Sequence, residues 1–175
     1  MKYIKLFLIS LIVFFVLFTL MGLLFPSTIK SVKAVVINKP PKQVLESISK
    51  FENWKEWYPF FSPAENATIK HETDSAIVFS NNGKELHVTN IKTDSNNIQF
   101  SITTISGKET ANQFFALPVN EAIVQTQLVW NETEHLKWYP WDRFRGLLLE
   151  RTKGIYLDTA LNRFKNYLEH INQQN

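Results

Sequence analysis

The hydrophobic pattern of the chain begins with one long apolar run. Leu6 to Phe25 covers twenty positions without a charged side chain. At about 1.5 Å per residue, a helix of this length crosses the roughly 30 Å hydrocarbon layer of a membrane. A cleaved secretory signal is the alternative, but the run is longer than the apolar part of most signals and no small-residue cleavage motif follows it. We therefore predict a retained transmembrane anchor at residues 1–26.

Lysines flank this run on both sides, with Lys2 and Lys5 before it and four more between Lys30 and Lys42. The positive-inside rule compares such flanks, and because they nearly balance, the side of the membrane that carries the globular part stays open. About six residues separate Phe25 from the first strand-like residue, and they reach roughly 20 Å when extended. The globular domain, expected at residues 31–172, should therefore lie close to the membrane surface.

A strand and two short helices are predicted next. Ser31 to Asn38 (SVKAVVIN) alternates loosely and is rich in Val and Ile, as in a strand with one buried face. Pro40 and Pro41 end it, and Pro41 suits the first position of a helix whose apolar residues recur at spacings of four and three from Val44. Glu52 to Tyr58 predicts a second short helix that ends at a proline.

A long β region follows, in which turn residues interrupt the alternation and no helical period persists. Leu86 and Val88 fall on one face of a predicted strand, and Glu85 and His87 fall on the opposite, wetter face. With the first strand, the segments make about seven strands joined by short turns, which predicts a mostly antiparallel sheet. The later strands are expected at residues 67–71, 76–80, 84–93, 96–106, 113–118 and 121–131.

The chain ends in a long helical pattern from Trp141 to Ile171, where apolar residues repeat at spacings of three and four, most regularly after Leu157. The order of elements is therefore anchor, strand, two short helices, six strands and long helix. This order predicts an α+β helix-grip fold, in which a curved antiparallel sheet wraps around the C-terminal helix and one transmembrane helix precedes both.

Composition removes several classes of function. The net charge is +3, and because Lys2 and Lys5 precede the apolar run, the rest carries 3 − 2 = +1, which is no nucleic-acid footprint. The chain has no cysteine, so thiol nucleophiles, thiolate metal sites and disulfides are excluded. It also lacks P-loop, H-E-x-x-H and EF-hand patterns. We predict no metal site and no cofactor.

Histidine chemistry is not favoured either. None of the four histidines lies in a nucleophile motif, and all fit solvated positions. Glu85 and His87 share a strand face and could form an acid/base pair, but that face is expected to be wet. No catalytic residue is predicted, and a non-enzymatic role is favoured. The four histidines are His71, His87, His135 and His170.

Aromatic residues carry the remaining signal, since they make up 14% of the chain. For a single ring, core packing is the favoured interpretation, because protein interiors are close-packed. For the set, we predict that some rings line an apolar cavity that binds by desolvation and shape. The predicted cavity residues are Trp54, Trp57, Phe60, Val88, Phe100, Ile102, Leu128, Trp130, Phe144 and Leu148.

A second aromatic cluster lies where the last helix begins. It mixes amphipathic rings with cations, as membrane-interface belts do. The alternative is that Trp138 and Trp141 only pack at the helix start, and this interpretation is favoured as long as their exposure is unknown. The cluster consists of Lys137, Trp138, Tyr139, Trp141, Arg143 and Arg145.

Three segments in this order resemble a known family. They are KAVVINKPPKQVLESISKFENWKEWYPF at Lys33 to Phe60, FFALPVNEAIVQTQLVW at Phe114 to Trp130 and YPWDRFRGLLLER at Tyr139 to Arg151. They resemble the SRPBCC superfamily, also called START-like, and in particular its bacterial polyketide cyclase/dehydrase-type members. The resemblance implies a helix-grip fold with a deep, largely apolar cavity for lipids, polyketides or other hydrophobic ligands. A membrane span before such a domain resembles a recurrent arrangement in this group and implies the bacterial cell membrane.

Our leading hypothesis is membrane-anchored binding of a hydrophobic small molecule or lipid in an internal cavity. The partners would be that molecule and the membrane, through residues 6–25, with no nucleic acid. A cyclase or dehydratase acting on a hydrophobic carbonyl compound is an alternative that requires a polar group inside the cavity. A ligand-free protein-interaction module is another, and it would show a filled interior and a large exposed apolar patch.

Overall fold

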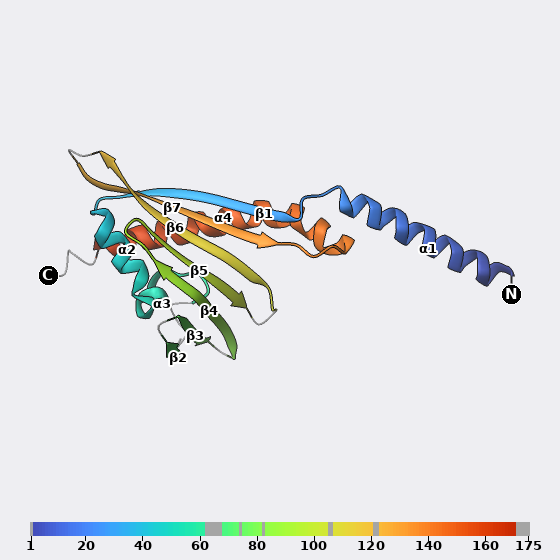
Figure 1. Cartoon of the computed structure of the whole chain (residues 1–175), viewed down its shortest axis with the longest axis horizontal. Coiled ribbons are helices and arrows are strands. Elements are labelled where there is room, and N and C mark those ends of the chain that lie inside the picture. The colour runs from blue at the N-terminus through green and yellow to red at the C-terminus, as the bar shows by residue number, and fades with distance from the viewer. Residues whose placement is uncertain are drawn as a thin grey trace.

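The computed structural model describes residues 2–61, 68–73, 75–81, 83–104, 107–120 and 123–170. A helix at the N-terminus projects from an α+β body (Figure 1). The elements are α1 (Lys2–Leu23), β1 (Thr28–Ile37), α2 (Pro41–Ser49), the 3-10 turn η1 (Phe51–Asn53), α3 (Trp54–Trp57), β2 (Thr68–Thr73), β3 (Ala76–Asn81), β4 (Lys84–Thr93), β5 (Asn97–Thr104), β6 (Glu109–Asn120), β7 (Ile123–His135) and α4 (Pro140–His170).

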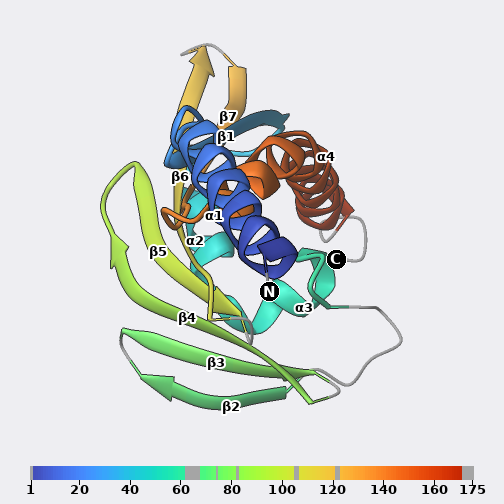
Figure 2. The same cartoon turned by 90° about the vertical axis from the view of Figure 1, so that its right-hand side faces the viewer.

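The seven strands form one antiparallel sheet in the order β1-β7-β6-β5-β4-β3-β2. Neighbours in sequence pair throughout, except that the first strand pairs with the last, with Thr28 opposite His135 and Ile37 opposite Thr126. Seen from the end where α1 lies, the sheet curves around one side of the body, and α4 lies on the other (Figure 2). The predicted helix-grip fold is confirmed.

Three strand boundaries differ from the sequence-based expectation by three or more residues. β1 begins at Thr28, before the expected Ser31, β6 begins at Glu109, and β7 continues to His135, past the expected Asn131. Polar residues made these extensions hard to predict. The extensions form because β1, β6 and β7 pair along these stretches and because the inward glutamates of β7 find cationic partners on α4.

Aromatic rings fill the interior beneath α2 and α3. Trp54 is completely buried, and its indole Nε1 donates a hydrogen bond to the carbonyl of Ile48 at 2.8 Å, so burial leaves no polar atom of the side chain unpaired. Its ring lies 4.9 Å from the ring of Phe51 and 5.2 Å from that of Phe100. The C-terminal half of α4 covers this cluster with Leu157, Leu161, Phe164 and Leu168, all of them buried.

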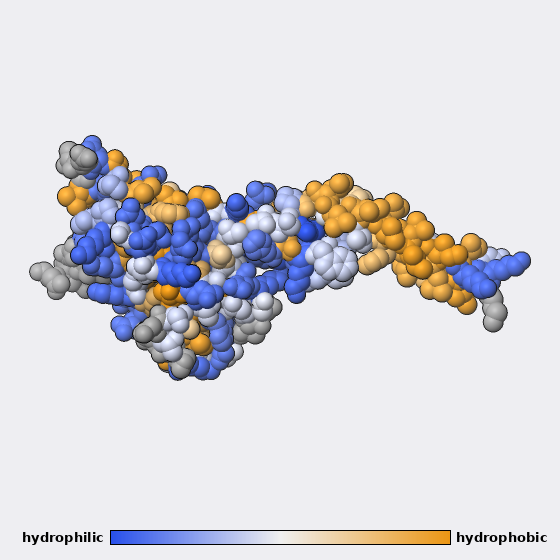
Figure 3. Space-filling model, in the orientation of Figure 1, coloured by the Kyte–Doolittle hydropathy of each residue, from blue (hydrophilic) through white to orange (hydrophobic). Residues whose placement is uncertain are grey.

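The helix α1 is exposed along almost its whole length. Within the described part of the chain, α1 is the one helix that is long and apolar enough to cross a membrane. A signal sequence near the N-terminus would meet the same criteria of length and composition. Figure 3 shows that hydrophobic residues concentrate along it, whereas the visible face of the body is mainly hydrophilic. Its last turns contact the start of α4, where a Cβ on Gly22 would come within 2.9 Å of Pro140. Only a residue without a side chain fits there.

Replacing Trp54 by alanine should destabilise the body strongly. The substitution leaves a large cavity among rings that cannot collapse into it, and such changes cost about 3–5 kcal/mol. Urea unfolding of residues 27–175 measures the loss. Trp138→Ala is the matched control, because Trp138 is 64% exposed and should change the free energy of unfolding by less than about 0.5 kcal/mol. Equal effects of the two substitutions would contradict the assignment of Trp54 to the core.

Candidate functional site

A cleft of about 450 Å³ lies between the sheet and the N-terminal half of α4. It begins where the aromatic core ends. The strands β4 to β7 provide one side, the segment after α3 closes one end, and α4 provides the other side. The lining residues are Tyr58, Phe60, Leu86, Ile102, Thr104, Lys108, Thr110, Glu132, Glu134, Thr152, Lys153 and Tyr156.

One wall of the cleft is aromatic and aliphatic. Leu86 from β4 and Ile102 from β5 present buried side chains, and Phe60 packs edge-on against Phe61 with ring centroids 5.2 Å apart. Leu86 and Ile102 alternate with outward-facing polar residues along their strands, which is why one side of the sheet is dry. An apolar group of a ligand that binds against this wall would be removed from water, and the aromatic core would stay buried.

Two tyrosines meet at the inner end of this wall. Tyr58 is buried, and burial together with the neighbouring Tyr156 raises the pKa of its phenol well above the ordinary value. Burial also raises the pKa of Tyr156, to about 12. Both phenols therefore stay protonated at neutral pH, and each can donate a hydrogen bond. Tyr156 reaches the cleft from α4 and can offer this donor to a ligand.

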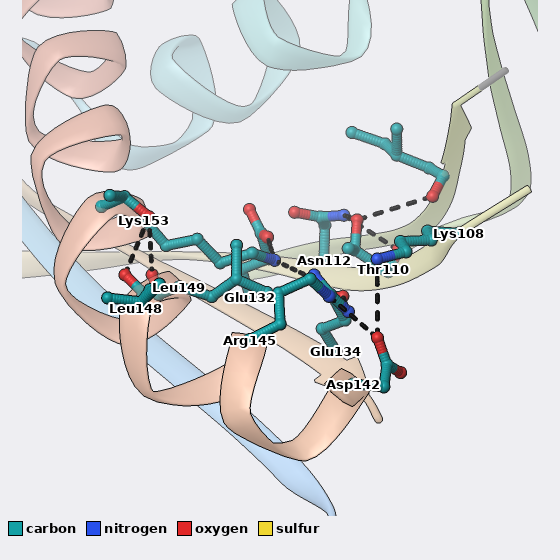
Figure 4. Close-up of polar contacts among 12 residues, drawn as sticks. Lys108, Thr110, Asn112, Glu132, Glu134, Asp142, Arg145, Leu148, Leu149 and Lys153 are labelled. Carbon is teal, nitrogen blue, oxygen red and sulfur yellow. Dashed lines mark hydrogen bonds and ion pairs between the residues drawn. The ribbon is translucent and has the colours of Figure 1, made fainter. Parts of the chain in front are cut away.

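The opposite end of the cleft contains a network of ion pairs between β7 and α4 (Figure 4). Glu132 and Glu134 lie two apart on the inward face of β7, beyond Trp130. Lys153 on α4 contacts both glutamates, at 2.8 Å from Oε2 of Glu134. Arg145 joins Glu134 to the first turn of α4, with its Nη2 at 2.8 Å from Oε1 of Glu134.

Asp142 extends the network to the start of α4. Its Oδ1 accepts from Nε of Arg145 at 2.8 Å and lies 3.6 Å from Nζ of Lys108, while its Oδ2 accepts from the backbone N–H of Lys137 at 2.8 Å. The side chains of Asp142 and Glu134 are only 7% and 6% exposed. Three carboxylates and three cations thus form one connected, balanced group.

The surroundings keep two of these carboxylates, Glu134 and Asp142, ionised. Burial by itself would raise the pKa of Glu134, but hydrogen bonds from Lys153 and Arg145 and the charges of both outweigh it and hold the pKa below its usual value. For Asp142, burial likewise opposes ionisation, and hydrogen bonds from Arg145 and the Lys137 backbone lower the pKa overall. The same contacts raise the pKa of Arg145 against the effect of its burial.

The ten predicted cavity residues occupy four different places. Phe60 and Ile102 line the cleft. Phe144 packs on α1 instead, 4.8 Å from the ring of Phe18, and Leu148 points outward and is 73% exposed. The other six are buried in the core next to the cleft: Trp54, Trp57, Val88, Phe100, Leu128 and Trp130. Their contact with a ligand stays a prediction.

The ion-pair network was not predicted from the sequence. A signal was present, because the inward positions of β7 run from Leu128 through Trp130 to Glu132 and Glu134, so two acidic residues continue a buried face. Charged residues are almost never fully buried unless paired, so this pattern indicates partners. Their identity could not be read off, since Arg145 and Lys153 follow in a separate helix.

Other candidate chemistry lies elsewhere. Glu85 and His87 are 3.3 Å apart on the outer face of β4, and Glu85 is also held by Lys70 at 2.6 Å, which makes this pair part of a solvated surface. The side chain of His71 lies outside the described residues. No group of three or more potential metal ligands occurs among the residues that the structure describes.

The arrangement suits recognition of an amphipathic molecule. Its apolar wall can take a hydrocarbon or aromatic group, and Tyr156 and the edge of the ion network can form hydrogen bonds with a polar group. The network itself is poorly suited to proton transfer, because each of its carboxylates already has a cationic partner and two of them have lowered pKa values.

Among known proteins, the fold is supported by similarity to solved structures and not by similarity of sequence. No protein-family model and no curated protein matches the sequence. Among solved structures, a START superfamily protein from Mycobacterium smegmatis is similar, with 14% identity, a TM-score of 0.61, and 81% of this chain aligned to 98% of that one.

Two further solved structures extend the comparison. A protein of unknown function from Staphylococcus aureus has 13% identity, a TM-score of 0.66, and coverage of 83% of this chain and 96% of its own. The Zhui aromatase/cyclase from Streptomyces sp. R1128 has 16% identity, a TM-score of 0.57, and coverage of 81% and 94%. The body that follows α1 therefore has the START-like, SRPBCC polyketide cyclase-type fold.

Proposed function

We propose that this chain is a membrane-anchored binding protein that holds a hydrophobic small molecule or lipid in the cleft between the sheet and α4. The observation that carries this proposal is the cleft itself. Its volume of about 450 Å³ falls in the range of small-molecule sites, and its lining combines an apolar wall with a few polar groups at one end.

The charge balance of the cleft indicates what kind of polar group the ligand carries. Lys108, Arg145 and Lys153 offset Glu132, Glu134 and Asp142, so a charged ligand group would have to be buried without a spare partner. Burying an unpaired charge is strongly unfavourable. A neutral hydroxyl or carbonyl group can instead accept a hydrogen bond from the protonated phenol of Tyr156. We therefore expect an uncharged amphipathic ligand.

The anchor would keep the cleft near its source of ligand. Only residues 24–27 separate the end of α1 from the start of β1. Such a short connection holds the body at the membrane surface, where lipophilic molecules are concentrated, and raises their effective concentration at the cleft. In this proposal, α1 spans the bilayer as a single-pass anchor.

Mass spectrometry of extracts from the purified body tests the proposal most directly. The similar structures above are covered over 98% and 96% of their length by 81% and 83% of this chain, so we expect residues 27–175 to fold alone. After expression in bacteria, this fragment should carry uncharged apolar molecules in near-stoichiometric amounts. A fragment that is folded but free of small molecules, and that does not bind apolar probes, would contradict the proposal.

Blocking the cleft should abolish binding without unfolding the body. Thr152 lies on the α4 side of the cleft, so Thr152→Trp should fill it and weaken binding of the uncharged fluorescent probe N-phenyl-1-naphthylamine at least tenfold, or about 1.4 kcal/mol. Thr159→Trp is the matched control, because Thr159 is also exposed on α4 and also donates to the carbonyl four residues earlier, but lies outside the cleft lining. Equal binding by both variants would place the probe elsewhere.

A cyclase- or dehydratase-type enzyme is the second candidate. It is favoured by one observation, the meeting of the Tyr156 phenol, Lys153 and Glu132 at the cleft, because such chemistry needs polar groups inside. The pairing of Lys153 with two glutamates argues for the binding role, since these groups are engaged with each other.

Acid should destabilise the body through the ion network. The pKa values of Glu134 and Asp142 are lower in the folded state than in the unfolded chain, so their contribution to stability is complete above the unfolded values near 4 and is lost as the pH falls through the folded values. Urea unfolding of residues 27–175 between about pH 7 and pH 3 should show this fall.

The variant Glu134→Gln should be less stable at neutral pH, because it leaves Lys153 and Arg145 with one carboxylate fewer, and its stability should depend less on pH. Glu85→Gln on the outer face provides a control at an exposed ion pair. A pH dependence as steep in Glu134→Gln as in the parent would show that Glu134 does not contribute to it.

A further inference from the structure

Two of the five tryptophans are exposed side by side at one end of the body. Trp138 is 64% and Trp141 58% exposed, whereas the other three are at most 1% exposed. Tyr139 stacks on Trp141 with ring centroids 4.5 Å apart, and Nζ of Lys137 lies 5.8 Å from the centroid of the Tyr139 ring. We call Trp138, Tyr139 and Trp141 the aromatic tip. The interpretation that these tryptophans only pack at the helix start is therefore wrong.

The contacts of α1 set the position of this tip relative to the apolar run. Pro140, within the tip segment, touches Gly22, and Phe144 stacks on Phe18 at 4.8 Å and contacts Phe25 at 5.1 Å. At about 1.5 Å per residue, Gly22 lies roughly 5 Å and Phe18 roughly 10 Å before the end of the apolar run at Phe25. Measured along α1, the start of α4 therefore lies beside residues of the apolar run and not beyond the end of that run.

We infer that the aromatic tip inserts into the head-group layer of the same membrane that α1 spans. This inference rests on the anchoring part of the proposed function. If residues 6–25 occupy the hydrocarbon layer, a tip level with Gly22 lies at the boundary between hydrocarbon and head groups. Trp and Tyr favour this layer, because their rings are apolar and their N–H or O–H groups can bind water or head groups.

The charged groups around the tip agree with this position. Arg143 donates from Nη1 to the carbonyl of Phe25 at 3.3 Å, which satisfies a backbone acceptor just after the end of α1. Lys137 is exposed beside Tyr139, where its ammonium can reach lipid phosphates while its alkyl chain stays near the rings. Asp142, the acidic residue of this first turn, is turned inward into the ion network and stays away from the phosphates.

The aromatic tip also lies next to one end of the cleft. Asp142 directly follows Trp141 and lies 3.6 Å from Lys108, which lines the cleft (Figure 4). The end of the cleft at Lys108 is therefore next to the surface that we place in the head groups. A lipophilic molecule in the outer part of the bilayer would have a short path into the cleft.

Lipid quenching of tryptophan fluorescence tests the insertion. The full chain is reconstituted into phosphatidylcholine vesicles in which part of the lipid carries bromine near the head-group end of the acyl chain. Bromine should quench up to about two fifths of the emission, because two of the five tryptophans lie in the tip. The variant Trp138→Phe/Trp141→Phe keeps aromatic rings in place and should lose most of this lipid-dependent quenching. The aqueous quencher acrylamide should reach the tip tryptophans less in vesicles than in the detergent-solubilised chain.

Three outcomes would overturn the inference. The first is quenching by bromine that is unchanged in the double phenylalanine variant. The second is a tip that acrylamide reaches equally in vesicles and detergent while the chain withstands alkaline carbonate extraction, which would leave the anchor in place without insertion. The third is release of the full chain by carbonate, which would remove the anchor itself. Ligand binding by residues 27–175 is measured separately, so each outcome can be distinguished from failure of the binding proposal.

Discussion

The ion pairs between β7 and α4 are the interaction on which the candidate site depends. The C-terminal half of α4 packs on the sheet through leucine and phenylalanine side chains, which are buried together with the aromatic core. In the N-terminal half, Gly146 packs closely on Ile29 and Leu136, and toward β7 the contact is made by long charged side chains, Arg145 and Lys153 reaching Glu134 and Glu132. The cleft lies beside these ion pairs and is lined by Glu132, Glu134 and Lys153.

Burying this ion-pair network costs free energy, and that cost explains why its charges are paired. Charges lose their hydration on burial, and the loss is offset only when the geometry supplies partners for all of them. Here Glu132 and Glu134 lie on β7 and their partners Arg145 and Lys153 lie on α4, so these ion pairs form only when α4 is correctly placed against β7. The ion pairs between β7 and α4 therefore line a polar site for a ligand and also fix the position of the helix relative to the sheet.

The long helix α4 links the other parts of the molecule as well. Its first turns contact α1 through Pro140 and Phe144 and carry part of the exposed aromatic tip, its middle section borders the cleft, and its last turns close the core. In the proposed function, where α1 spans the bilayer, a molecule that enters from the membrane would meet these regions in that order. The START-like fold thus places α4 against the sheet, and the side chains on α4 determine the contact with α1, part of the aromatic tip and one side of the cleft.

Much of the fold could be predicted from the sequence, because the periods of two and of three to four residues report which faces are buried. The apolar run of α1, the alternation around Leu86 and Val88 and the helical repeat after Leu157 are local patterns, and the structure confirms the elements they predicted. The site could be predicted only in part. Phe60 and Ile102 line the cleft, but periodicity cannot distinguish a ring that fills a core, such as Trp54, from one that borders a cavity. Only the tertiary structure brings Lys153 to Glu132 and exposes Trp138, because ion pairing and exposure depend on neighbours that are distant in the chain.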